Sequence, residues 1–101
     1  MRELPQLVYH PEAEKELDEA TIWYHEKGEN LRLNFEEEYK RKALLVLHFP
    51  ERYAKKHGNY RETKIKSFPY LIVYRYNKTK HLITISSVHH TSKNPKSKYR
   101  K

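Results

Sequence analysis

The stretch YRETKIKSFPYLIVYRY, residues 60–76, decides the fold class because its side chains alternate with a period of two. From residue 61 to 66 the side chains point alternately to the two faces of a strand. One face carries the charged group Glu62, Lys64 and Lys66. Ser67-Phe68-Pro69 interrupts the pattern, and residues 70–76 are rich in β-branched and aromatic side chains, which predicts a second strand.

The pattern continues toward the C-terminus. Residues 77–80, Asn-Lys-Thr-Lys, predict a turn, and residues 81–88 predict a third strand. Consecutive strands with short links favour an antiparallel meander. The tail that follows, residues 91–101, is strongly basic.

Toward the N-terminus the period changes to that of a helix. Residues 6–10 predict a short strand, and Pro11 suits the first position of a helix, which should end at Lys27 and Gly28. Asn30 should cap a second helix that ends before Pro50. Both helices carry an apolar stripe at helical spacing: Ala13, Leu17, Ala20 and Tyr24 in the first, and Leu31, Phe35, Tyr39, Ala43 and Val46 in the second.

These elements predict one α+β domain over residues 1–101, in the order β-α-α-β-β-β. The two helices should form a hairpin packed on one face of a mainly antiparallel sheet. Tyr70, Tyr74 and Tyr76 are expected to pack in the core and against the sheet.

Charge divides the chain in two. The net charge is +8, but residues 1–50 carry 7 Lys and Arg against 11 Asp and Glu, whereas residues 51–101 carry 14 against 2. The basic half therefore suits a polyanion or an acidic protein as partner.

Composition excludes several kinds of site. The chain has no Cys, so a disulfide framework or thiol nucleophile is impossible. The histidines show no metal-ligand spacing, the one Asp gives no support to a Ser-His-Asp triad, and no metal or cofactor is expected. No apolar run approaches the roughly 20 residues of a membrane span, and the N-terminus has no apolar signal core. A small cytoplasmic domain is expected.

Four motifs in order resemble the RelE/ParE superfamily of small bacterial toxins from type II toxin–antitoxin pairs, once called plasmid stabilisation proteins. They are Tyr-His-Pro-Glu-Ala (9–13), Phe-Pro-Glu-Arg-Tyr (49–53), Phe-Pro-Tyr-Leu-Ile-Val-Tyr-Arg (68–75) and Val-His-His-Thr-Ser-Lys-Asn-Pro (88–95). The resemblance implies a toxin restrained by a cognate antitoxin. RelE-like members cleave mRNA on the ribosome through the RNA's own 2′-hydroxyl, and ParE-like members poison DNA gyrase.

Carried over position by position, the resemblance implies His90 as general acid, with Lys64 and Lys93 as its catalytic partners. Further contacts to substrate are implied for Lys66, Arg75, His89, Lys96, Lys98, Tyr99 and Arg100. Three positions depart from the nuclease pattern: Glu62 stands where a basic residue is expected, Leu71 where an Arg is expected, and Lys93 where an Arg often follows His-Thr-Ser.

Each of these residues can instead have a purely structural role. Lys64 and Lys66 can be the solvated face of a strand, and Arg75 can pair with Glu62 or a helix Glu. His89 and His90 should point to opposite faces, so one of them can be a packing residue. The basic tail can serve only solubility.

The function expected from the sequence is ribosome-dependent mRNA cleavage by a toxin whose nuclease residue set is incomplete. The alternatives are a non-enzymatic gyrase inhibitor and a toxin-fold binding module that has lost potency.

Overall fold

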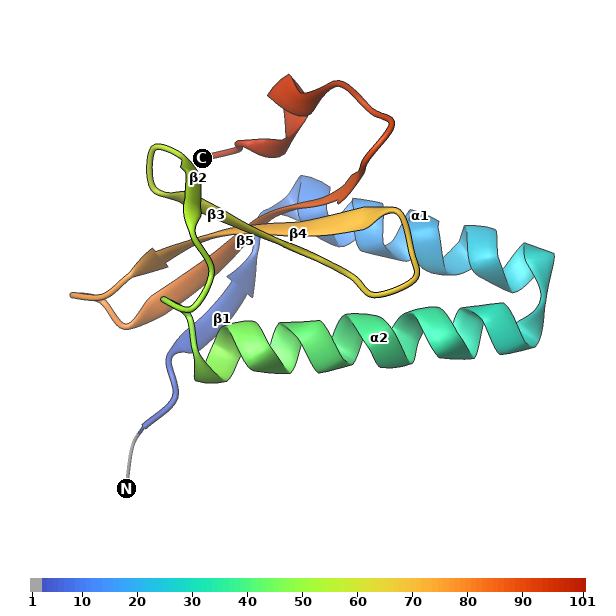
Figure 1. Ribbon diagram of the computed structural model, residues 1–101, viewed down its shortest axis with the longest axis horizontal. Helices are drawn as coiled ribbons and strands as arrows, with labels where there is room; N and C mark the ends of the chain where they lie inside the picture. Colours follow the sequence, from blue (N-terminus) through green and yellow to red (C-terminus); the bar gives the residue numbers. More distant parts are fainter. Residues whose placement is uncertain (1–2) are drawn as a thin grey trace.

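The computed structural model describes residues 3–101 and contains two helices packed on a five-stranded sheet (Figure 1). The predicted α+β class is confirmed. The elements in chain order are β1 (Gln6–Tyr9), α1 (Pro11–Lys27), α2 (Glu29–His48), β2 (Lys55–His57), β3 (Tyr60–Lys64), β4 (Tyr70–Asn77), β5 (Leu82–His90) and the 3₁₀ turn η1 (Pro95–Lys98).

The sheet has the strand order β1-β5-β4-β3-β2. Strands β3, β4 and β5 form the predicted antiparallel meander. β1 joins the far side of β5 in parallel, which is possible because the helical hairpin provides the long crossover that parallel strands require. The sequence did not predict β2, because its three exposed residues show no apolar alternation. Gly58 adopts φ 54° in the turn that joins it to β3.

A single residue, Gly28, links the two helices of the hairpin. α1 starts at Pro11 as predicted, and the imidazole Nδ1 of His10 accepts the N–H of Glu12 at 3.0 Å as its N-cap. Gly28 ends α1 with φ 157°, a backbone conformation that favours glycine, and α2 begins at the next residue. The prediction that Asn30 caps α2 was wrong, because a one-residue link places Asn30 already inside the helix.

The core lies between the hairpin and one face of the sheet. Its buried side chains are Ala13, Ala20, Tyr24, Phe35, Tyr39, Val46, Ile65, Phe68, Ile72, Tyr74, Ile83, Ile85 and Val88. Burying each large apolar side chain contributes roughly 1.5–3 kcal/mol, so this layer is the main source of stability. The predicted helical stripes are largely confirmed, although Leu31 is 42% exposed. Tyr70 and Tyr76 pack against the core as expected.

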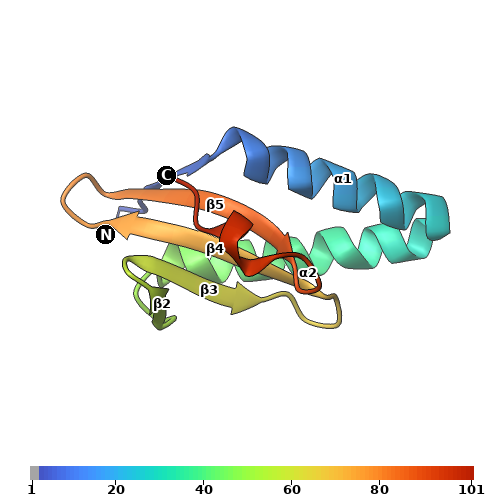
Figure 2. The same cartoon turned by 90° about the horizontal axis from the view of Figure 1, so that it is seen from above.

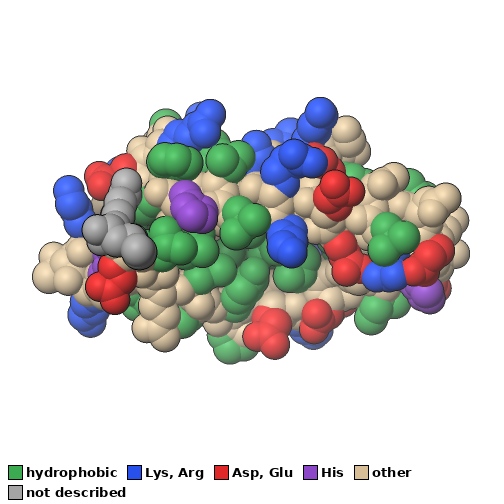
Figure 3. Space-filling model, turned by 90° about the horizontal axis from the view of Figure 1, so that it is seen from below, with side chains coloured by type: hydrophobic (Ala, Val, Ile, Leu, Met, Phe, Trp, Pro, Cys, Tyr) green, Lys and Arg blue, Asp and Glu red, His purple; other side chains and the backbone are tan. Residues whose placement is uncertain are grey.

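The two sides of the molecule differ. On the helix side, exposed hydrophobic side chains lie between charged ones over the half nearest the N-terminus (Figure 3). On the other side, residues 91–101 fold back over the sheet, with η1 above the central strands (Figure 2). Hereafter this segment is called the tail, and the sheet face beneath it the tail face.

Candidate functional site

The tail face is built from alternate residues of three neighbouring strands. Lys64 of β3 lies opposite Leu71 of β4, which in turn lies opposite His89 of β5. Glu62, two residues before Lys64, shares its face. Most of the residues to which the resemblance assigned catalysis or binding therefore gather on this side.

The tail is anchored to this face through its backbone. The Tyr60 hydroxyl donates a hydrogen bond to the carbonyl of Arg100 at 2.9 Å, and the Ser86 hydroxyl donates to the carbonyl of Lys98 at 3.0 Å. Ser86 has no residue opposite it on β4, because the pairing of β4 with β5 shifts at this point: Val73 lies opposite Ser87, but Tyr74 lies opposite Ile85. Ser86 is therefore free to contact the tail. The β-bulge thus supplies an anchor for the tail.

Glu62 lies at the centre of the tail contacts. Its carboxylate accepts hydrogen bonds from the Lys98 ammonium at 2.9 Å and the Tyr99 hydroxyl at 2.5 Å. The Glu62 and Lys98 side chains are only 11% and 12% exposed. Burial favours a higher pKa, but the bonds from Tyr99 and Lys98 outweigh it and hold the pKa of Glu62 below its ordinary value. The carboxylate is therefore ionised and already paired.

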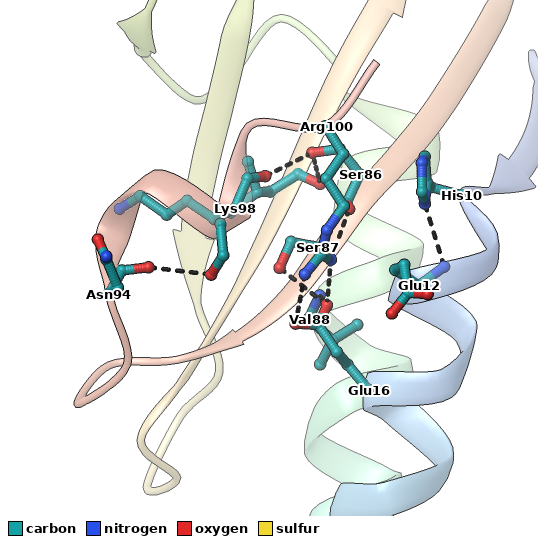
Figure 4. A network of polar contacts seen from close by, with 11 residues as sticks. His10, Glu12, Glu16, Ser86, Ser87, Val88, Asn94, Lys98 and Arg100 are labelled. Atoms are coloured by element: carbon teal, nitrogen blue, oxygen red, sulfur yellow. Dashed lines mark hydrogen bonds and ion pairs between the residues drawn. The ribbon is translucent and has the colours of Figure 1, made fainter.

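Glu16 of α1 forms a second anchor (Figure 4). Its carboxylate receives two hydrogen bonds from the Arg100 guanidinium, at 2.7 and 3.1 Å. It also accepts the Ser87 hydroxyl at 2.9 Å and the Val88 N–H at 3.1 Å. β1 pairs with β5 only as far as Ile85, so the Val88 N–H lies beyond the end of this pairing. Glu16 supplies the acceptor for that N–H.

Aromatic rings extend the tail contacts toward β2. The ring of Tyr99 stacks on His57 with centroids 4.5 Å apart and lies 5.1 Å from Tyr60. The guanidinium of Arg75 lies over the Tyr60 ring at 5.5 Å, and its Nε is buried without a partner. The suggested ion pair of Arg75 with Glu62 or a helix Glu was wrong: among residues 3–101 Arg75 pairs with neither, and the Glu62 carboxylate is bound by Lys98 and Tyr99.

His89 and His90 point to opposite faces, as predicted. His89 is 2% exposed, and its Nδ1 has no hydrogen-bond partner. Burial, and then the positive charge of Lys98, lower the pKa of His89 below its ordinary value. His89 is therefore a neutral packing residue on the tail face, out of reach of a ligand.

His90 lies on the helix side, in a groove of about 350 Å³ between α1 and the adjoining ends of β4 and β5. This feature is hereafter called the α1 groove. Ser92 donates its N–H to His90 Nδ1 at 3.1 Å, and its hydroxyl lies 2.7 Å from the same nitrogen. Because Nδ1 accepts, the neutral ring carries its proton on Nε2. Lys93 also lines the α1 groove.

The three residues predicted as catalytic are thus divided by the sheet. His90 and Lys93 share the α1 groove, whereas Lys64 belongs to the tail face, where its ammonium donates to the carbonyl of Phe68 at 3.2 Å. Lys66 and Lys96 are exposed. Lys98, Tyr99 and Arg100 make the internal contacts described above.

Sequence reasoning missed several residues of these sites: Glu16, His57, Ser86, Glu19 and Trp23. Glu16 and Glu19 are two of the many acidic residues of the helices, and no local pattern distinguishes them. Among residues 3–101, no three His, Asp or Glu side chains come together as a metal site requires.

Comparison with known proteins supports the resemblance. A model of the family described as ParE toxin of type II toxin-antitoxin system, parDE, matches residues 7–95. The chain belongs to the ParE toxin family. This ParE-family toxin is therefore a member of a type II toxin–antitoxin system, and membership implies an antitoxin partner.

Among solved structures, the isolated E. coli RelE toxin has the same fold as this ParE-family chain. The TM-score is 0.58 at 21% identity, over 90% of this chain and 88% of that one. No curated protein matches the sequence significantly. Within the described part of the chain, neither helix is long and apolar enough to cross a membrane.

Proposed function

We propose that this toxin inhibits growth by binding a protein target without cleaving RNA, and that the target is DNA gyrase, as the ParE-like resemblance implies. The observation that carries this proposal is the ionised Glu62 at the centre of the tail face, bound to Lys98 and Tyr99. RNA cleavage through a 2′-hydroxyl requires free cations and proton donors around a strongly anionic transition state.

The tail face offers the opposite arrangement. Lys98 and Tyr99 are bound to Glu62, Arg100 is bound to Glu16, and His89 is buried. Because the charges of Glu62 and Lys98 compensate each other, the pair offers no net positive charge to an incoming phosphate. Four residues that the resemblance assigned to substrate binding are therefore engaged within the protein or buried.

The test is induction of the toxin without its antitoxin, in cells where mRNA integrity and the DNA-damage response are followed separately. We expect a DNA-damage response with intact mRNA, and inhibition of supercoiling by purified gyrase. His90→Gln should retain this effect. Early arrest of translation with cut mRNA would contradict the proposal, and so would the absence of a growth defect at good expression, which is expected of a weakened binding module.

A second candidate function, ribosome-dependent mRNA cleavage, is favoured by the α1 groove. There His90 is held by Ser92 with its proton on Nε2, and Lys93 lies nearby. To protonate a leaving 5′-oxygen as general acid, His90 must be protonated on both ring nitrogens, so Nδ1 must give up the Ser92 N–H and donate instead, for example to the Ser92 hydroxyl 2.7 Å away. Under this alternative, His90→Gln abolishes cleavage while leaving antitoxin binding intact. Both targets are cytoplasmic, and we place the toxin there.

A further inference from the structure

The α1 groove is lined by four rings that support one another. Trp23 is 53% exposed, and its ring lies edge-on to Tyr24 with centroids 5.1 Å apart. Tyr24 lies edge-on to Tyr70 at 6.3 Å, and Tyr70 lies edge-on to His90 at 5.0 Å. Tyr24 is buried in the core, so the wall is formed before any ligand arrives.

The α1 groove also carries negative charge. Burial, the neighbouring Tyr24, and the charges of Glu16 and Glu19 raise the pKa of the Tyr70 hydroxyl, so a negative potential reaches this wall. The carboxylate of Glu16 is occupied by Arg100. Glu19 makes no ion pair or side-chain hydrogen bond with any residue from 3 to 101. Its carboxylate is available to a cation from outside.

We infer that the α1 groove receives an arginine side chain of a protein partner, held between its aromatic rings and Glu19. A guanidinium is planar, so it stacks flat on an aromatic ring and donates two parallel hydrogen bonds to a carboxylate. An ammonium is attracted to both groups but can neither stack nor form the bidentate pair, and an apolar group gains nothing from the carboxylate. The same helix already shows this chemistry, because Glu16, one turn before Glu19, holds the guanidinium of Arg100.

The basic residues nearby do not fill the site. The ammonium of Lys27 lies 4.9 Å from the Trp23 ring centroid, which shows that this ring accepts a cation on one side. Lys93 is attached at the rim by its backbone N–H, which donates to the carbonyl of His90 at 3.0 Å. Its ammonium makes no hydrogen bond or ion pair with residues 3–101, so it can leave the rim when an arginine enters.

The inference rests on the proposed function in that a protein target supplies the arginine, but it can be tested separately. Trp23 is the only tryptophan of the chain, so its fluorescence reports on the α1 groove. We expect N-acetyl-arginine amide to change this fluorescence saturably in the millimolar range. The neutral analogue N-acetyl-citrulline amide should not.

Glu19→Gln should weaken arginine binding several-fold. The matched control Glu26→Gln, on the same helix but outside the groove, should bind like the unmodified toxin. No saturable response to the arginine probe, an equal response to citrulline, or saturation by inorganic phosphate instead would each overturn the inference. If arginine binds but induction cuts mRNA, the groove assignment stands and the proposed function fails. If induction damages DNA but arginine does not bind, the proposed function stands and the groove assignment fails.

Discussion

The carboxylate of Glu62 in β3 lies 2.9 Å from the ammonium of Lys98 in the tail, and both side chains are almost fully covered. The pair joins the middle of the sheet to the C-terminal segment, and Tyr99 donates to the same carboxylate. Glu62 is therefore the anchor of the tail on the tail face itself, beside the Glu16–Arg100 contact on α1.

Replacing Glu62 tests this dependence. Glu62→Gln keeps the shape of the side chain but removes its charge, so Lys98 loses its partner in a covered position. We expect the free energy of unfolding to fall by about 1.5–3 kcal/mol, the range for hydrogen bonds to charged groups. Urea denaturation measures the loss. Glu37→Gln is the control, because its ion pair with Arg41 is exposed and should contribute under about 0.5 kcal/mol. Equal effects of the two changes would argue against the anchoring role of Glu62.

The second anchor should show energetic coupling between Glu16 and Arg100. In a double-mutant cycle of Glu16→Ala and Arg100→Met, we expect a coupling of about 0.5–3 kcal/mol. Glu16→Ala should cost more stability than Arg100→Met, since it also leaves the Val88 N–H without its acceptor. Thermal unfolding of the four proteins gives the cycle. Strictly additive losses would mean that the bidentate contact contributes nothing.

Acidification should loosen the protein through His89. The pKa of His89 is lowered in the folded state by burial and by Lys98, with Arg100 adding to the repulsion and Glu16 opposing it. The unfolded chain therefore binds a proton more readily than the folded one, so stability decreases as the pH falls below about 6.5 toward the folded pKa.

Unfolding followed by circular dichroism between pH 7.5 and 5.5 measures this effect. His89→Gln cannot titrate and should show a smaller decrease over the same interval, with the difference assigned to His89. Parallel curves for the two proteins would remove His89 from the pH dependence. Below about pH 4.5 a further loss is expected as Glu62, whose pKa is lowered in the folded state, takes up a proton.

A buried hydrogen bond should make Tyr74 sensitive to loss of its hydroxyl. This hydroxyl donates to the carbonyl of Pro50 at 2.7 Å, and the side chain is fully buried. Tyr74→Phe leaves that carbonyl without a donor, so we expect a loss of about 1–3 kcal/mol in urea denaturation. Tyr76→Phe is the matched control: its side chain is only partly buried, and its hydroxyl makes no hydrogen bond within residues 3–101. A similar loss in both would contradict the role of the Pro50 contact.

Much of the architecture follows from local patterns. The change of period at Tyr60, the helix start at Pro11 and the break at Gly28 each depend on side chains close in sequence, and all three are found in the structure. β2 escaped prediction because a short edge strand of exposed residues carries no apolar alternation. The Asn30 cap was wrong because the length of the link, rather than the residue type, decided where α2 begins.

The candidate site could be predicted only as a set of residue types. The basic residues 98–101 were recognised, but their partners Glu62 and Glu16 lie on a strand and a helix far away in sequence. Whether a lysine is free for a ligand or paired internally depends on which carboxylate the folded chain brings beside it. The spacing of residues along the sequence does not show which carboxylate that is.

The sequence therefore establishes the elements, the charge asymmetry and the alternation that separates His89 from His90, because these arise from the covalent order and the geometry of helices and strands. The tertiary structure decides that β1 lies parallel to β5, that the tail closes over the sheet, and that its cations are bound to Glu62 and Glu16. Those outcomes depend on strand register and chain path, which bring together groups that the sequence keeps apart.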